Sequence, residues 1–355
     1  MKKLYFTFLL FVSTNFYGQT VFSTAFGGEF PVPIQIINSD LYVGTFNTQK
    51  LYRLDINNPS TITTVANLTN LAWKMDYDPA NNDMYMGNIA GGLVKIDLDQ
   101  SLPITPENIN FITDLNGITI DGNIVYIASG KSIYSYDTSI GVSSYQLFFD
   151  ETEGSVRNPK VFNGELYYNL VTSSGMGSNN LYKIELSSPS TSKTLVSTSL
   201  GGISQSSLLV GNYLYIGTES SNNLLRYDLT QSLPIVPVTV LSSLGAGVIG
   251  LAHSNGTIYY VTGQQIIYSL QDSVLSNNDV GAAPFSLYPN PSNDYIQIKT
   301  DRIVEGTYAI FNVNGVKVDT GNYTNQIKTS NLKPGLYFLN LKQNGNSYTM
   351  KFLKN

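Results

Sequence analysis

The sequence predicts an all-β fold, and three observations support this prediction. Of 355 residues, 25 are Tyr, 30 are Gly and only 13% are charged, a composition typical of strands joined by many turns. Apolar and polar residues alternate with period two in short runs, as they do in half-buried strands. One such pattern, LYVGTFNTQKLYRLD at 41–55, returns five more times along the chain.

The first 19 residues have the three-part layout of a secretory signal peptide. Lys2 and Lys3 form a positive end, Leu4 to Val12 form an apolar segment, and a polar stretch with small residues follows. The apolar run is too short to span a bilayer, and no later segment is long enough. We therefore expect export, cleavage near Gly18 or Gln19, and no transmembrane segment.

The repeats predict a six-bladed β-propeller over residues 20–272. They begin at 41, 84, 125, 166, 214 and 258, in steps of 43, 41, 41, 48 and 44 residues. A period of 40–45 residues with four short strands per unit indicates propeller blades. The strands expected in the first blade, from the innermost outward, are Pro33–Ile37, Leu41–Thr45, Leu51–Ile56 and Ile62–Leu68.

The last repeat lacks an outer strand, because the sequence after Leu270 is polar and broken by Asn and Gly. Thr20–Phe26 is an apolar-alternating segment that precedes the first inner strand. We expect it to complete the sixth blade, which leaves the ring without an exposed edge.

Two finer patterns lie within the repeats. DLDQSLPI at 97–104 and DLTQSLPI at 228–235 are 131 residues apart, so blades one to three resemble a duplicate of blades four to six. Acidic residues also recur at the end of the third strand. We interpret them as turn caps that accept backbone N–H groups, not as metal ligands. They are Asp55, Asp97, Asp137, Glu185 and Asp228.

A second domain is predicted at 285–355, after a polar linker at 273–284. The repeat period stops there, and seven short alternating segments fit a small Ig-like β-sandwich. The charge changes as well: residues 20–284 carry a net −11 and residues 285–355 a net +4. An acidic main body argues against a nucleic-acid partner, because phosphate binding needs clustered cations.

Four segments of this domain resemble a known family. They are FSLYPNP (285–291), YAIFNVNGVKV (308–318), NLKPGLYFLNL (331–341) and YTMKFLKN (348–355). Together they resemble the carboxy-terminal sorting domain (type A, Por) of the type IX secretion system of Bacteroidetes. The resemblance implies that the secretion machinery is a partner of residues 285–355 and that the protein is secreted or held at the outer cell surface. The residues that carry it most are Pro289, Asn290, Pro291, Leu332, Gly335, Tyr337 and Lys351.

Ligands of propellers bind at one face of the central channel, where the loops before the inner strands converge. Amide-rich side chains there suit a glycan, on which a tryptophan can stack. Arg157 and Lys160 suit a carboxylate ligand, or an ion pair with Glu151 or Glu153. The longest loop, Ser173–Asn180, is a candidate lip over this site. The candidate ligand residues are Trp73, Asn116, Arg157, Asn158 and Gln205.

Three functions are compatible with this pattern. Residues 249–263 and 116–130 resemble NHL-type and gluconolactonase-like propellers, whose lactonases hold Ca²⁺ with Glu, Asn and Asp. Glu29 and Asn158 match the first two ligands, but no aspartate starts a later inner strand. We therefore favour a monomeric, non-catalytic module that binds a glycan or protein without a cofactor. A calcium-dependent lactonase or hydrolase is the alternative, and an inert spacer is the third hypothesis.

The single histidine, His253, is expected in the core or a turn.

Overall fold

The computed structural model describes residues 19–69, 71–88, 92–110, 114–172, 179–198, 201–276, 286–299, 305–313, 316–343 and 346–355. Outside these ranges lie the expected signal peptide up to residue 18, Asn70, most of the loop at 173–180 and most of the linker at 273–284. The chain divides into two compact units, Met1–Gln271 and Asp272–Asn355. No helix in the described ranges has the length and apolar character needed to cross a membrane.

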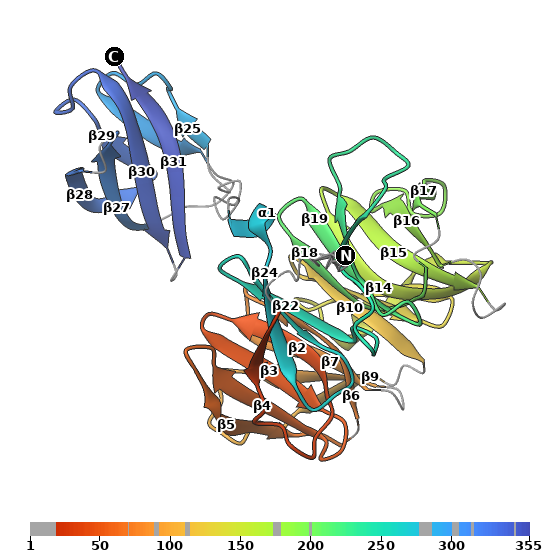
Figure 1. The fold of residues 1–355 in the computed structure, drawn as a ribbon. Coiled ribbons are helices and arrows are strands. Elements are labelled where there is room, and N and C mark those ends of the chain that lie inside the picture. The colour runs from red at the N-terminus through yellow and green to blue at the C-terminus, as the bar shows by residue number, and fades with distance from the viewer. Residues whose placement is uncertain are drawn as a thin grey trace, which may run out of the picture. The chain divides into compact units, whose positions relative to one another are not determined.

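The first unit is a six-bladed β-propeller of four-stranded antiparallel sheets (Figure 1). The inner strands are β2 Pro31–Ile37, β6 Ala72–Asp78, β10 Leu115–Asp121, β14 Gly154–Phe162, β18 Ile203–Val210 and β22 Gly250–Ser254. The second strands are β3 Asp40–Thr45, β7 Asp83–Asn88, β11 Ile124–Ser129, β15 Glu165–Thr172, β19 Tyr213–Glu219 and β23 Thr257–Val261.

The remaining strands of each blade lie farther from the channel. The third strands are β4 Lys50–Asp55, β8 Leu93–Asp97, β12 Ser132–Asp137, β16 Asn179–Glu185, β20 Leu224–Asp228 and β24 Ile267–Gln271. The outer strands are β5 Asn58–Asn67, β9 Glu107–Asn110, β13 Gln146–Asp150, β17 Thr194–Ser197, β21 Val238–Leu241 and β1 Thr20–Ser23. A short 3₁₀ helix, η1 (Val142–Ser144), precedes β13.

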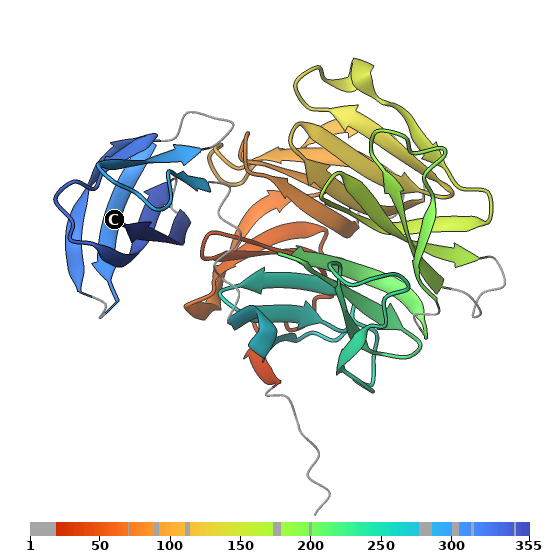
Figure 2. The same cartoon turned by 90° about the horizontal axis from the view of Figure 1, so that it is seen from above.

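The first strand completes the sixth blade, as the sequence predicts. β1 pairs antiparallel with β24, with Thr20 opposite Ser269 and Ser23 opposite Ile267 (Figure 2). The strand ends at Ser23 instead of Phe26, because the chain turns at residues 25–28. Phe26 is nevertheless fully buried, in a core that joins residues of the first and sixth blades.

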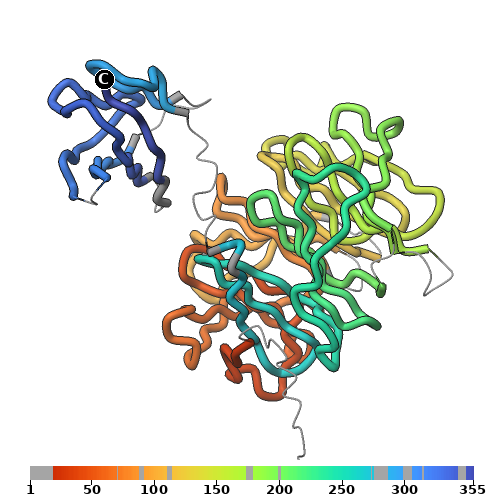
Figure 3. Tube along the Cα trace, turned by 45° about the horizontal axis from the view of Figure 1, so that its top comes forward, coloured from red at the N-terminus to blue at the C-terminus, as the bar shows by residue number. Residues whose placement is uncertain are grey.

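Neighbouring inner strands contact each other in chain order, from β2 to β6 and onward to β22, which contacts β2 (Figure 3). In five blades of the described chain, the inner strand also shifts register against its second strand, near its start in four of them and in the middle of β14, which marks a β-bulge. Bulges re-aim side chains and are frequent beside functional sites. The residues skipped by the pairing are Val32 and Pro33, Trp73, Asn116, Asn158 and Pro159, and Gln205.

Four of the five acids at the third-strand ends cap turns as predicted, whereas Glu185 Oε2 accepts from the Ser188 hydroxyl at 3.0 Å. Asp55 Oδ1 accepts a hydrogen bond of 2.8 Å from Asn57 N, and Asp97, Asp137 and Asp228 accept equivalent backbone bonds. The hydrogen bonds from Ser139 hold the pKa of Asp137 below its ordinary value. His253 also holds a turn, since its Nε2 accepts from Gly256 N at 3.1 Å.

The duplicated LPI motifs connect adjacent blades. The backbone N–H of Ile104 donates to Val65 O at 2.7 Å, so the loop before β9 in blade two joins the outer strand of blade one. Ile235 N donates to Val196 O at 2.8 Å in the same way, from blade five to blade four. Both isoleucines are 3% exposed and pack in cores shared by the two blades.

The second unit begins with a short helix, α1 (Ser273–Ser276), within the expected linker. Seven strands follow in two sheets, a three-stranded sheet in the order β25-β26-β29 and a four-stranded sheet in the order β28-β27-β30-β31. One apolar core lies between them. The strands are β25 Ser286–Tyr288, β26 Tyr295–Lys299, β27 Glu305–Asn312, β28 Lys317–Thr324, β29 Gln326–Lys328, β30 Gly335–Gln343 and β31 Asn346–Lys354.

Candidate functional site

The central channel of the propeller contains a cavity, hereafter the channel cavity. Its enclosed volume is about 50 Å³, and every inner strand contributes to its wall or adjoins it. Cavities that enclose a whole small molecule commonly have about 300–1,000 Å³, so this one can enclose only part of a ligand. The side chains of the wall with polar or aromatic character are Trp73, Lys74, Asn158, Lys160, Ser206 and Ser207.

The bulges determine which side chains surround this cavity. Trp73, Asn116, Asn158 and Gln205, four of the five predicted ligand residues, occupy bulge positions on four consecutive inner strands. Trp73 and Asn158 line the cavity. Gly117 makes the bulge of β14 possible, because a Cβ there would lie 2.3 Å from Pro159 Cδ and 2.7 Å from Asn158 N.

Lys74 connects three of the predicted residues. Its Nζ lies 2.9 Å from Asn158 Oδ1, donates also to the backbone oxygen of Gln205, and lies 5.4 Å from the centroid of the Trp73 ring. The side chain lines the cavity and is half-buried. Burial, together with the nearby charges of Arg157 and Lys160, lowers the pKa of Lys74 from 10.5 to about 7.

A buried chain of hydrogen bonds continues from Asn158 into the fifth blade. Asn158 Nδ2 donates to Ser204 Oγ at 2.7 Å, and Ser204 Oγ donates to Asn169 Oδ1 at 2.8 Å. Ser207 Oγ donates to Asn158 O at 3.1 Å. Asn158 has a φ of 49°, a left-handed conformation that asparagine tolerates better than most residues. The network therefore fixes Asn158 from both its side chain and its backbone.

The two cations whose charges act on Lys74, Lys160 in the cavity wall and Arg157 outside it, differ in their partners. Lys160 forms an ion pair of 3.1 Å with Asp76, both from inner strands. The Nε of Arg157 is buried and has no hydrogen-bond acceptor among the described residues. Burial lowers the pKa of Arg157, while the charges of Asp114 and Glu219 oppose this effect.

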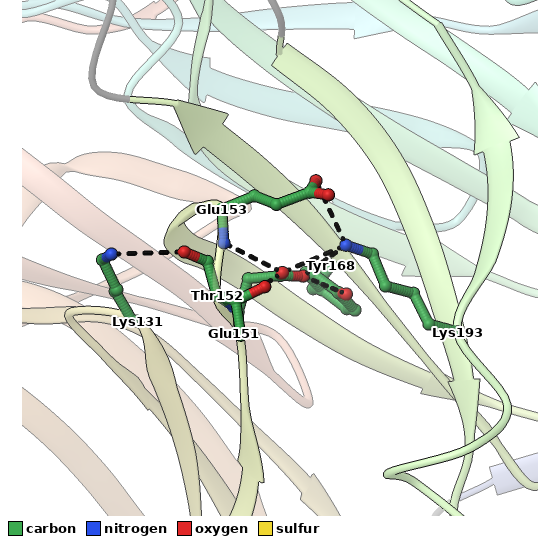
Figure 4. Close-up of polar contacts among 6 residues, drawn as sticks. All are labelled: Lys131, Glu151, Thr152, Glu153, Tyr168 and Lys193. Atoms are coloured by element: carbon green, nitrogen blue, oxygen red, sulfur yellow. Dashed lines mark hydrogen bonds and ion pairs between the residues drawn. The ribbon is translucent and has the colours of Figure 1, made fainter.

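The proposed pairing of Arg157 or Lys160 with Glu151 or Glu153 is wrong, because Lys193 takes that place (Figure 4). Lys193 Nζ lies 2.9 Å from Glu151 Oε2 and 3.4 Å from Glu153 Oε2, and Tyr168 donates to Glu151 at 2.8 Å. Burial alone would raise the pKa of Glu151, but its bonds from Lys193 and Tyr168 hold the pKa below its ordinary value.

Asn116, Arg157 and Gln205 do not line the cavity themselves. Asn116 Nδ2 donates to Asp114 O at 2.9 Å, so this side chain holds its own loop. Gln205 Nε2 donates to Glu219, and Gln205 Oε1 is buried without a donor in the described chain. Gln205 therefore offers an unsatisfied acceptor beside the network.

The residues of the calcium alternative do not form a site that fits this ion. Glu29 Oε2 accepts from Thr48 N at 3.2 Å, within the loops of the first blade. Asn158 Oδ1 accepts from the ammonium group of Lys74. A divalent cation at Asn158 would lie beside that positive charge, and calcium prefers several anionic oxygen ligands.

The sequence did not point to Lys74, Ser204 or Asn169. Lys74 and Asp76 are two residues apart in β6 (AWKMDYD), so their side chains lie on the same face of the strand. This spacing of charged residues on an inner strand could have predicted a polar channel wall. Ser204 and Asn169 lie on strands of different blades, and only the folded ring brings them together.

Comparisons with known proteins bear on both units. Residues 286–355 match the family model described as secretion system C-terminal sorting domain. The carboxy-terminal unit is a type IX sorting domain. The chain is accordingly a secreted or cell-surface protein. No curated protein matches it in sequence.

Solved structures similar to the chain include a nidogen–laminin complex, at 9% identity and a TM-score of 0.50, with 60% of this chain and 79% of that chain covered. This similarity concerns the fold alone. The extracellular domain of a one-component system from B. thetaiotaomicron matches at 14% identity and a TM-score of 0.46, over 92% of this chain and 50% of that chain.

The conspicuous residues of the sorting domain hold its last strand in place. Asn290 Oδ1, within Pro289-Asn290-Pro291, accepts from Leu353 N at 2.9 Å, and its Nδ2 donates to Lys351 O at 3.5 Å. Tyr337 packs on Phe352 with ring centroids 5.6 Å apart and donates to Lys333 O at 2.9 Å. The side chain of Lys351 is exposed.

Proposed function

We propose that the propeller of this exported protein is a non-catalytic module that binds a glycan at the channel cavity. The observation that carries this proposal is the cavity wall itself, which combines a half-buried tryptophan with amide, hydroxyl and ammonium groups from consecutive blades. Such groups recognise sugar hydroxyls, and the aromatic ring offers a stacking surface.

The hydroxyl groups of the wall support binding over nucleophilic catalysis. Ser206 Oγ donates to Val248 O at 2.8 Å, and Ser207 Oγ donates to Asn158 O. A nucleophilic serine needs a general base as its partner instead of a backbone carbonyl.

The test uses the single tryptophan of the chain as its own reporter. Trp73 lies in the cavity wall, so a bound sugar should change the intrinsic tryptophan fluorescence of the full chain. We expect binding on a glycan array, a fluorescence change with the soluble hits, and a loss of affinity of at least tenfold in Trp73→Ala, measured by calorimetry. Trp73→Phe should retain part of the affinity.

Three results would contradict the proposal. Unchanged affinity in Trp73→Ala would place the glycan elsewhere, and binding of no glycan would favour the inert spacer. A calcium-dependent rise in melting temperature that Glu29→Gln removes would favour the lactonase alternative.

A further inference from the structure

One inner strand of the sorting domain is apolar on both of its faces. β30 reads GLYFLNLKQ, in which Tyr337, Leu339 and Leu341 are buried in the core between the two sheets. Leu336 and Phe338 alternate with them, lie on the other face of the sheet, and are 41% and 38% exposed. Strands with a nearly continuous apolar run are commonly covered on both faces. The outer face of the four-stranded sheet therefore resembles an interface.

The strand register places further apolar side chains beside Phe338. It lies opposite Phe311 of β27 on one side and opposite Lys351 of β31 on the other. Phe311 in turn lies opposite Lys317 of β28, and the adjacent Val318, which the pairing skips, is 42% exposed. One row across the four strands β28, β27, β30 and β31 (Figure 1) thus has two phenylalanines in the middle and a lysine at each end.

The exposed and half-buried apolar side chains of this face form one group, hereafter the outer patch. In the row next to the phenylalanines, Leu336 lies opposite Leu353. The outer face of the other sheet is mainly polar, since Gln297, Gln326 and Lys328 are exposed there. Neighbouring exposed apolar side chains of this kind mark interaction surfaces. The residues of the outer patch are Phe311, Val318, Leu336, Phe338 and Leu353.

We propose that the sorting domain docks through the outer patch onto an apolar surface of the secretion machinery that has acidic residues at its rim. Aromatic side chains in the middle of an interface contribute most of its affinity, and rim charges select the partner. Lys317 and Lys351 are exposed at the two ends of the phenylalanine row, and residues 285–355 carry a net +4. This charge favours an acidic partner and disfavours a second copy of the same domain.

The experiment follows export of the full chain from a bacterium that has a type IX secretion system. We expect Phe338→Ser to lower the secreted fraction at least fivefold and Lys351→Glu at least threefold, with the protein retained in the cells. The matched controls are Tyr295→Ser and Lys328→Glu, at exposed residues of the other sheet. Both controls should be exported like the wild type.

The other results would overturn the proposal. Export of Phe338→Ser and Lys351→Glu at the wild-type level would show that the machinery does not use this face. An equal loss in the two controls would show that it does not distinguish the two sheets. Sedimentation of the purified chain, alone and with vesicles of anionic phospholipid, tests the other occupants. A dimer, or vesicle binding, that Phe338→Ser abolishes without a loss of export would assign the outer patch to a second copy or to lipid.

Melting curves of the purified chain show whether each variant is folded. The side chain of Lys351 is exposed, so Lys351→Glu keeps the test decisive if Phe338→Ser does not fold.

Discussion

At the scale of single residues, Lys74 combines features that oppose stability with features that favour a site. It donates to Asn158 and to Gln205 O, but the neighbouring charges on it are positive. The folded state therefore binds the proton of Lys74 less tightly than the unfolded chain does. Side chains whose pKa is shifted in the folded state are common at functional sites.

The lowered pKa of Lys74 should make the free energy of unfolding depend on pH. Between pH 7 and 10.5 the unfolded chain keeps the Lys74 proton that the folded protein has released, so raising the pH stabilises the fold. Relative to Lys74→Met, the wild-type protein should gain free energy of unfolding from pH 7 to 10 and gain none below pH 7. Urea denaturation at a series of pH values measures the difference. The same slope in Lys74→Met would show that other groups cause it, and Lys131→Met serves as the matched control.

The sequence predicted the candidate site only in part. The sequence placed Trp73 and Asn158 in loops before the inner strands, whereas Trp73 lies within β6 and Asn158 in the middle of β14, and both line the cavity. Their bulges are not visible in the sequence, because an extra residue in a strand depends on contacts with the next blade, as Gly117 and Pro159 show. The partner of Glu151 was missed for the same reason, since Lys193 comes from a distant loop.

At the scale of elements, the LPI motifs act as links between blades. Each places a buried isoleucine in the core between two sheets and a backbone bond on the outer strand of the preceding blade. The duplication was visible in the sequence, whereas this linking role was not, because the contact crosses from one repeat to another. Strand positions were predicted within a few residues, since alternation and turn residues are local signals.

Removing either isoleucine should weaken the propeller. We expect Ile104→Ala and Ile235→Ala each to lower the free energy of unfolding by about 2–5 kcal/mol, through lost burial and the resulting cavity. The two effects should add in the double variant, because the sites belong to different pairs of blades. Val236→Ala, at a valine that is 80% exposed, is the control. Chemical denaturation would contradict the linking role if both isoleucine variants matched this control.

At the scale of the whole molecule, the sixth blade combines the two ends of the propeller. β1 adds to β24, and Phe26 fills a core built from both the first and the sixth blades. The absence of cysteine from the sequence means that no disulfide reinforces this junction. Apolar packing and the strand pairing therefore have to hold it.

The junction can be tested with two phenylalanines four residues apart. Phe26 is fully buried, so Phe26→Ala should lower the free energy of unfolding by about 3–5 kcal/mol. Phe30 is 39% exposed, and Phe30→Ala should cost much less. Thermal and chemical denaturation measure both. Equal effects would show that the junction contributes no more than the surface beside it.

The pairing of β1 with β24 also sets an order in time. The sixth sheet cannot form before residue 271 has been synthesised, because its outer strand β1 lies at the start of the propeller and pairs with β24 at the end. Contacts between such distant residues form slowly, because a long loop must close first. A nascent chain therefore lacks the finished propeller until residue 271 has been synthesised.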